Sequence, residues 1–278
     1  MNVKLGAVAA VALTAAIAVG TAGANGSPYS PGLQYGWPGV GARDGVRYVA
    51  FGMPRSTIVA AVRARDGRVL RSRVVRGFYG VPLVAYDGTP GGLSGNGRTL
   101  VLGSYGPLPG RAGKTRFAVL GTKTLAVRRA IVLRGSWSFD AVSPDAATLF
   151  LTEHVRAGDD PLYRVRPFDL RTGRLGGAVV DRLESEAEMG GVPVARASSA
   201  DGRWAYTLYA RRGDEPFVHA LDTVRREAFC IDLPLRLGQG AQMGLRLELE
   251  SSGAELAVRR GVATVAVVDT RTFEARRS

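Results

Sequence analysis

The sequence predicts an all-β protein folded as a β-propeller of about five four-stranded blades. One pattern, a turn residue, a small residue, two spacers and an apolar run, occurs five times, about every 50 residues. A second tight-turn pattern follows each copy after roughly 20 further residues, again behind an apolar run. Sheets of this size bury both faces only by packing against one another, which radial repetition achieves.

The two patterns are defined by residues that suit tight turns, because Asp, Asn and Ser side chains can accept hydrogen bonds from backbone N–H groups ahead. The first pattern begins at Asp44, Asn96, Asp145, Asp201 and Ser252. The second is marked by Asp66, Gly121, Asp169, Asp222 and Asp269. One unit therefore reads as strand, tight turn, strand, longer connection, strand, tight turn, strand.

The predicted blades together form a single domain over residues 34–278. Their runs are short, rich in Val, Leu, Tyr and Phe, and partly alternating, which favours strands over helices. The approximate blades are residues 34–80, 81–134, 135–182, 190–233 and 243–278. We expect the first and last blades to close the ring. A β-sandwich with irregular spacing is the alternative fold.

The first residues of the chain have the pattern of a targeting signal. A weakly positive start is followed by an apolar, Ala- and Val-rich stretch and a small-x-small site, which predicts a signal peptide over residues 1–24. Residues 25–33 form a short N-terminal segment. An uncleaved membrane anchor is the alternative, because the apolar stretch is barely long enough to span a bilayer.

The charge and the cysteine content narrow the function classes. The chain carries a net charge of +13, but its arginines are scattered without a long run. For an exported protein we therefore expect no nucleic acid partner. We interpret the charge as a solvated face that is compatible with association with the cell wall. Cys230 is the single cysteine, so no disulfide forms within the chain, and its strand context AFCIDL indicates a packed residue.

The repeat resembles the YVTN/TolB-like propeller repeats of bacteria, which are relatives of WD-repeat blades. The segments SPDAATLFL at Ser143 and SADGRWAYTL at Ser199 are similar to the hairpin of that family, and FDLRTGRL at Phe168 is similar to the turn that follows it. The chain departs from the pattern at Asn96, Ser252, Ala146 and Gly121. The resemblance implies a propeller fold, and members of the family include binding proteins, lactonases and structural adaptors.

The two ends of the predicted propeller differ. Both tight turns of a blade lie at one end, whereas the long, variable connections lie at the other, because antiparallel strands alternate in direction. Function concentrates on variable loops carried by a rigid scaffold, so we expect any ligand at the loop end. These connections are residues 53–57, 76–92, 104–115, 134–137, 153–161, 182–192, 210–216 and 234–244.

Three residues are candidate catalytic groups. Glu153 and His154 lie together in one of these connections, where a histidine beside a carboxylate could act as a general base. Asp140 follows Trp137 and Phe139, and partial burial would raise the pKa of such a carboxyl and suit it to acid–base chemistry. Each of them has a structural reading as well, as a solvated loop residue or a hydrogen-bonded strand end.

Candidate ligand-binding residues lie on the innermost strands, which line the channel. Aromatic side chains at a channel mouth can stack on sugars or other flat groups, although most aromatics of a propeller serve to pack its blades. The candidates are Trp37, Tyr86, Asp87, Trp137 and Arg196, with Glu248 as a further channel residue.

Asp159 and Asp160 are candidate metal ligands. Carboxylate oxygens suit calcium, and Glu184, Glu186 and Glu188 could add others, but no regular calcium loop is present. The alternative is that these acidic residues form a charged surface loop that binds no cofactor. His219 lies among apolar residues in FVHALD, which indicates packing.

These observations predict an exported or cell-wall-associated module that binds a protein partner or an envelope glycan, or acts as a scaffold, rather than an enzyme. The alternative is a propeller hydrolase, similar to lactonases or glycosidases, that uses channel carboxylates and is assisted by a metal. If the leader is not cleaved, the same module is membrane-anchored.

Overall fold

The computed structural model describes residues 31–42, 44–158 and 161–278. The predicted signal peptide over residues 1–24 and the predicted metal ligands Asp159 and Asp160 lie outside the described residues. No helix among the described residues has both the length and the apolar character that a membrane crossing requires.

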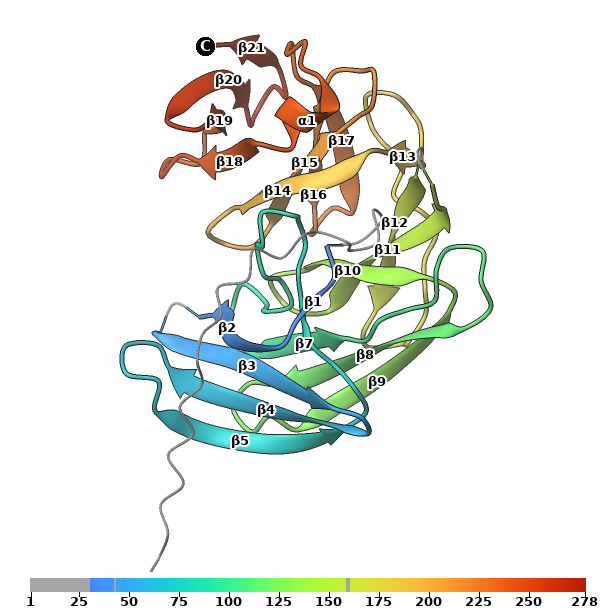
Figure 1. Cartoon of the computed structure of the whole chain (residues 1–278), viewed down its shortest axis with the longest axis vertical. Helices are drawn as coiled ribbons and strands as arrows, with labels where there is room; N and C mark the ends of the chain where they lie inside the picture. Colours follow the sequence, from blue (N-terminus) through green and yellow to red (C-terminus); the bar gives the residue numbers. More distant parts are fainter. Residues whose placement is uncertain (1–30, 43, 159–160) are drawn as a thin grey trace, which may run out of the picture.

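Five antiparallel sheets of three or four strands follow one another along the described residues, and the strands of each lie side by side in chain order. Figure 1 shows the sheets arranged around a common centre in the order of the sequence colours. This arrangement is the β-propeller type that the repeats predict. A short helix, α1 (Gln239–Gln242), which the sequence did not indicate, lies between the last two sheets.

The first two sheets differ in strand number. The first sheet comprises β2 (Gly36–Gly41), β3 (Val46–Met53), β4 (Ser56–Arg63) and β5 (Val69–Arg76). The second comprises β7 (Thr99–Gly103), β8 (Lys114–Gly121) and β9 (Val127–Arg134). Between them, β1 (Leu33–Gln34) pairs with β6 (Val81–Pro82). The prediction of four strands is therefore wrong for the second sheet.

The remaining three sheets have four strands each. The third comprises β10 (Trp137–Val142), β11 (Thr148–Arg156), β12 (Leu162–Asp169) and β13 (Met189–Gly190). The fourth comprises β14 (Val192–Ser198), β15 (Trp204–Ala210), β16 (Phe217–Asp222) and β17 (Glu227–Asp232). The fifth comprises β18 (Leu245–Leu249), β19 (Glu255–Arg260), β20 (Ala263–Asp269) and β21 (Ala275–Arg277). The third sheet thus extends beyond residue 182, where we expected its blade to end.

The repeated turns explain the repeated sequence. In each first-pattern turn, the side-chain oxygen of the opening residue accepts a hydrogen bond from the backbone N–H two residues ahead, at 3.0 Å for Asp44 and 2.9 Å for Asn96. Asn96 and Ser252 therefore replace aspartate without loss of the turn. The next residue has a positive φ, which glycine adopts at little cost; Ala146 adopts φ 57° in the third sheet.

The centre of the molecule is crossed by the segment between β6 and β7. The backbone N–H of Tyr86 donates to the Pro193 carbonyl at 2.9 Å, and that of Asp87 donates to the Val194 carbonyl at 2.9 Å. Further along, the turn at Gly95 lies against Gly202 of the fourth sheet. The inner edge of β7 therefore has only isolated bridges, between Leu93 and Leu100 and between Gly80 and Gly103, rather than a regular fourth strand.

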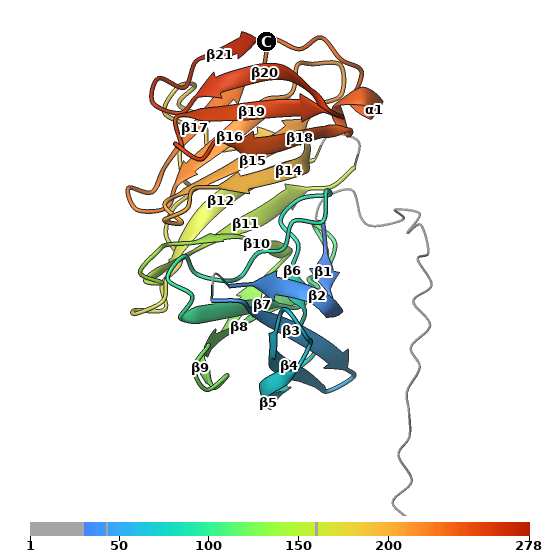
Figure 2. The same cartoon turned by 90° about the vertical axis from the view of Figure 1, so that its left-hand side faces the viewer.

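Hydrophobic cores form between consecutive sheets. Leu100 packs against the first sheet, Phe117 against the third, and Leu208 against the fifth, and each is fully or almost fully buried. Among the described residues, no core cluster joins the first and last sheets. Figure 2 shows these two sheets at opposite ends of the molecule. The expected closure of the ring between them is therefore wrong for the part of the chain that the structure describes.

Candidate functional site

A cavity of about 230 Å³ lies at the loop end, between the second and third sheets. Three predicted residues, Tyr86, Trp137 and His154, line this cavity, which we call the rim pocket. Its wall is completed by the β7–β8 connection, including Tyr105 and Leu108. The structure thus brings together one predicted catalytic residue and two predicted ligand-binding residues at the predicted end of the molecule.

His154 is the most perturbed group of the rim pocket. Its side chain is buried, and burial lowers its pKa from 6.5 to about 4, because desolvation disfavours the charged imidazolium. Its Nε2 lies 2.9 Å from the Ser138 hydroxyl, while its Nδ1 is buried without a hydrogen-bond partner in the protein. The ring is therefore neutral at pH 7 and shares a hydrogen bond with a serine in the same pocket.

Glu153 does not join His154, although the two are adjacent in sequence. Successive residues of a strand point to opposite faces of the sheet. The Glu153 carboxylate lies 3.2 Å from Arg166 and 3.5 Å from Arg164. The Glu153 carboxylate is thus engaged by two arginines and not by His154, and catalytic roles for the two residues stay predictions.

Asp140 and Arg196 form a buried ion pair between the third and fourth sheets. The same Arg196 nitrogen also donates to the Asp140 carbonyl at 2.8 Å. The second carboxylate oxygen of Asp140 and the Nε of Arg196 are buried without protein partners. Two residues predicted for different roles, catalysis and ligand binding, are thus one charge-paired unit.

The other predicted residues lie apart from the rim pocket. Asp87 accepts hydrogen bonds from Thr89 in a turn, at 2.9 and 2.7 Å. Trp37 is half exposed, and the Arg47 guanidinium stacks on its ring at 4.9 Å. Glu248 is paired with Arg259 on the surface of the fifth sheet.

The acidic connection before β13 does not form a metal site in the described residues. There, no group of three His, Cys, Asp or Glu side chains is placed to hold a metal ion. Asp181 in this connection accepts backbone hydrogen bonds from Leu183 and Cys230. Cys230 is largely buried, and this burial raises the pKa of its thiol, which makes it a poor nucleophile at neutral pH.

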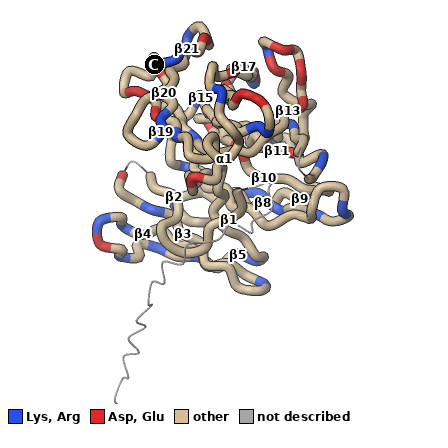
Figure 3. Tube along the Cα trace, turned by 45° about the horizontal axis from the view of Figure 1, so that its top comes forward, with Lys and Arg blue, Asp and Glu red and all other residues tan. Residues whose placement is uncertain are grey.

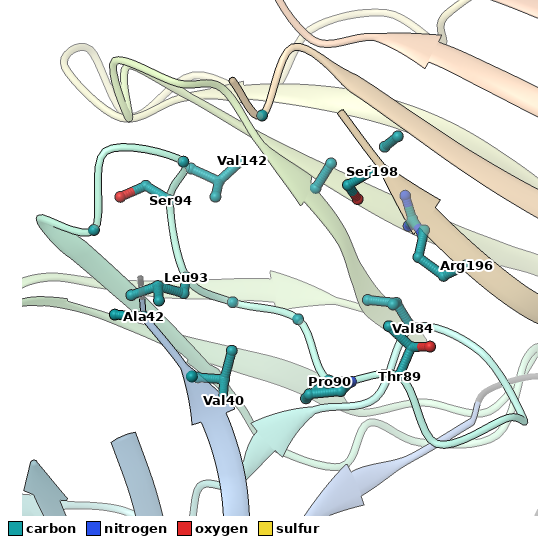
Figure 4. Close-up of a pocket in the computed structure, with 18 of the residues that line it drawn as sticks. Val40, Ala42, Val84, Thr89, Pro90, Leu93, Ser94, Val142, Arg196 and Ser198 are labelled. Carbon is teal, nitrogen blue, oxygen red and sulfur yellow. The ribbon is translucent and has the colours of Figure 1, made fainter. Parts of the chain in front are cut away.

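A second, larger cavity of about 600 Å³ opens at the end of the tight turns. Figure 4 shows its walls, with Val40 and Ala42 from the first sheet, Leu93 and Ser94 from the crossing segment, and Arg196 from β14. Glycine, alanine, serine and valine predominate among the lining residues. Sequence reasoning did not expect a cavity at this end, because the turns there are short and regular.

Sequence reasoning also missed an apolar cluster beside the rim pocket. Tyr35 lies 5.1 Å from Phe78 and 6.3 Å from Tyr105, measured between ring centroids, and Leu108 follows in the same connection as Tyr105. We call these four residues the aromatic rim. The exposed fractions are 40% for Phe78, 59% for Tyr105 and 56% for Leu108. Phe78, Tyr105 and Leu108 lie in connections of variable length, which was the signal that could have found them, whereas Tyr35 lies outside those connections.

Within the described residues, the charged positions are distributed over the whole molecule (Figure 3). Figure 3 shows lysine and arginine positions spread over all five sheets rather than along one continuous stretch. Many arginines are neutralised locally, as in the pairs of Arg203 with Asp222 and Arg276 with Glu255.

No family model matches the chain, and a search of curated proteins finds no match. Among solved structures, hydrazine synthase of Kuenenia stuttgartiensis is similar at a TM-score of 0.45 and 13% identity, over 90% of this chain and 79% of that chain. TolB of Acinetobacter baumannii is similar at a TM-score of 0.38 and 14% identity, over 84% of this chain and 56% of that one.

A third similar structure is Sqt1 of Saccharomyces cerevisiae, with a TM-score of 0.41 and 12% identity over 82% of this chain and 56% of that chain. TolB-like propellers are thus among the structural neighbours, while no family model identifies a YVTN repeat. Similarity at this level carries no argument about activity. The sheet topology itself defines the chain as a β-propeller-type module.

Proposed function

We propose that this chain is an extracytoplasmic propeller module that binds a protein partner at its loop end. The observation that carries the proposal is the aromatic rim, in which Phe78, Tyr105 and Leu108 are exposed. Tyr105 and Leu108 also line the rim pocket, which is large enough for an apolar side chain of the partner. Contiguous exposed apolar surface of this kind marks interaction sites, and tyrosine, tryptophan and phenylalanine are enriched at protein interfaces.

The chemistry of the rim pocket favours a protein over an envelope glycan. Among the residues that line it there is no Asp, Glu, Asn, Gln, Lys or Arg. Sugars are held by stacking together with several polar groups that satisfy their hydroxyls, whereas a buried hydroxyl without a partner is costly. An apolar or proline side chain makes no such demand.

The carboxylate hydrolase that the sequence left as an alternative receives no support from the described residues. Asp140 is paired with Arg196, and Glu153 with Arg164 and Arg166. The two carboxylates therefore do not face a common substrate, as glycoside hydrolysis requires. Calcium binding by Asp159 and Asp160 stays a prediction, since both lie outside the described residues.

The test is site-specific photo-crosslinking in the native host, with a benzophenone amino acid at Leu108 and, as the matched control, at Val262 in the exposed β19–β20 turn. We expect one protein to crosslink from Leu108 and not from Val262. The purified pair should then bind, and Tyr105→Ser should weaken binding about tenfold or more, as loss of an aromatic anchor does. Equal crosslinking from both positions, or recovery of glycan without protein, would contradict the proposal.

The proposed location has its own test. If the leader is removed as predicted, the N-terminus of the protein recovered from outside the cytoplasm begins at Asn25. Recovery with the membrane fraction and an intact N-terminus would instead support the anchored alternative.

A further inference from the structure

Ser138 and His154 lie together at the floor of the rim pocket. Ser138 is in β10, His154 is in the neighbouring strand β11, and Oγ and Nε2 are 2.9 Å apart. Both residues line the pocket, and Ser138 is partly exposed. A serine hydroxyl within hydrogen-bond reach of a neutral imidazole is the arrangement by which a general base activates a nucleophile.

His154 also borders a second, much smaller cavity. A cavity of about 20 Å³ is lined by His154, Asp140, Thr152 and Tyr163, among others. Each of these two residues, His154 and Asp140, is more than nine-tenths buried. The Nδ1 of His154 and one carboxylate oxygen of Asp140 have no hydrogen-bond partner in the protein. Buried polar atoms are almost always hydrogen-bonded, and a cavity of this volume holds one water molecule.

We propose that Ser138, His154 and Asp140 form an esterase relay, in which one internal water joins the Asp140 carboxylate to Nδ1–H of His154. Ser138 is the nucleophile and His154 is the base; Asp140 acts through the water and the ring, so it is a positioning residue. An acceptor beyond Nδ1 holds the proton there, which leaves the Nε2 lone pair for the serine O–H.

The reaction balances without a cofactor. Ser138 Oγ attacks the ester carbonyl and its proton passes to His154 Nε2; the C–O bond to the leaving group then breaks as that proton returns to the departing alcohol. Water, deprotonated by the same nitrogen, attacks the acyl-serine, and the proton on Nε2 returns to Ser138 as the carboxylic acid leaves. The products are one alcohol and one carboxylic acid.

The pocket defines the substrate class. Its lining is uncharged and rich in proline and aromatic residues, and its volume of about 230 Å³ admits a small molecule. The substrate is therefore an uncharged ester with a short apolar acyl group. Turnover is slow, because a base with a pKa of about 4 accepts a proton weakly at pH 7.

The groups around His154 determine how its activity depends on pH. Tyr163 of β12 stands edge-on to its ring at 6.1 Å, Tyr209 of β15 lies beyond Tyr163, and Asp140 of β10 is charge-paired with Arg196 of β14. Tyr86 of the crossing segment lines the rim pocket. Both Tyr163 and Tyr209 have pKa values raised by burial, so they stay neutral and leave desolvation as the dominant influence.

The experiment uses the intact protein, a fluorophosphonate probe and p-nitrophenyl butyrate. We expect the probe to modify Ser138, located by mass spectrometry, and hydrolysis to fall about a hundredfold or more in Ser138→Ala and in His154→Gln. Ser72→Ala, at an exposed serine in β5, is the matched control, and it keeps the wild-type rate. Labelling elsewhere, no labelling, or full activity in Ser138→Ala would overturn the proposal.

Two readouts do not depend on the folding of a variant. Labelling of the wild-type protein is one, and the pH profile of hydrolysis is the other. We expect the acid limb of the profile near pH 4, where His154 becomes protonated, rather than near pH 6.5. An acid limb near pH 6.5 would mean that an exposed group is the base. Partner binding is measured separately by crosslinking from Leu108. The esterase proposal can therefore fail while the proposed partner binding holds, and the reverse.

Discussion

Two neighbouring interfaces differ in polarity: the one between the fourth and fifth sheets is apolar, whereas the one between the third and fourth sheets contains polar and charged side chains. The former is a continuous apolar core in which Leu208, Leu256 and Val258 are fully buried. The latter has a small apolar cluster and a row of polar residues that the strand register aligns across the fourth sheet. That row is Arg196, Thr207, His219 and Cys230.

The polar third–fourth interface contributes less to the stability of the fold than an apolar interface would. The third–fourth interface contains the Asp140–Arg196 pair and both histidines, and burial lowers the pKa of each histidine. Buried charges cost desolvation energy that packed aliphatic side chains do not, so such an interface is not the most stable solution. Perturbed groups of this kind concentrate at functional sites, which agrees with the relay proposed there.

The largest effect should come from breaking the buried ion pair. Arg196→Met leaves the Asp140 carboxylate buried and unpaired, and we expect the free energy of unfolding to fall by about 3 to 5 kcal/mol. Urea denaturation measures it. A loss below about 1 kcal/mol would mean that the pair is hydrated and that the third–fourth interface is not the low-dielectric environment described here.

A cavity in the apolar interface should have a slightly smaller effect. Leu208→Ala removes a fully buried side chain between the fourth and fifth sheets, with an expected loss of about 3 to 4 kcal/mol and no change in ester hydrolysis per folded molecule. The control is Val262→Ala, which alters a side chain that is 92% exposed and should change stability by less than about 0.5 kcal/mol. Equal effects of the two substitutions would refute the packing assignment.

The pH dependence of stability should distinguish the two interfaces. The pKa of His154 is lowered to about 4 in the folded protein, so the unfolded chain binds a proton first as the pH falls. Its contribution is complete above about pH 6.5 and is lost between pH 6.5 and pH 4, by about 3 kcal/mol in all. Urea unfolding at several pH values should show a smaller loss over this range for His154→Gln. Identical slopes would contradict the burial of His154.

We expect the smallest loss of stability from a threonine whose hydroxyl bonds to the connection between two sheets, an arrangement that occurs twice in the described residues. Thr57 Oγ donates to the Gly77 carbonyl and accepts from the Tyr79 N–H, both at 2.8 Å, and Thr115 makes the same two contacts with Gly135 and Trp137. Thr57→Val leaves buried backbone groups unpaired, so we expect about 1 to 2 kcal/mol of destabilisation in thermal unfolding. No change would mean that these groups find water.

Much of the fold could be predicted from local chemistry. The turn residues are recognisable because Asp44 and its equivalents each accept a hydrogen bond two residues ahead, a contact confined to a few residues of chain. The path of the segment before β7 could not be foreseen, since Tyr86 and Asp87 in it pair with β14, more than 100 residues away.

The site was predictable in part for the same reason. The loop end was indicated by the variable lengths of its connections, and the rim pocket lies there with Tyr86, Trp137 and His154. The pairing of Ser138 with His154, and that of Asp140 with Arg196, depends on strand register and on packing between sheets. No spacing in the sequence encodes either contact, so Ser138 was missed and the pair was read as two separate candidates.

The central claim, that the third–fourth interface is polar for chemistry rather than for stability, is tested most directly by the double variant Asp140→Leu with Arg196→Met. The measurement pairs its free energy of unfolding in urea with its rate of p-nitrophenyl butyrate hydrolysis. We predict stability equal to or above wild type, as for other buried pairs replaced by apolar side chains, and hydrolysis reduced about tenfold or more. Wild-type hydrolysis in a stable double variant, or a protein that no longer folds, would contradict it.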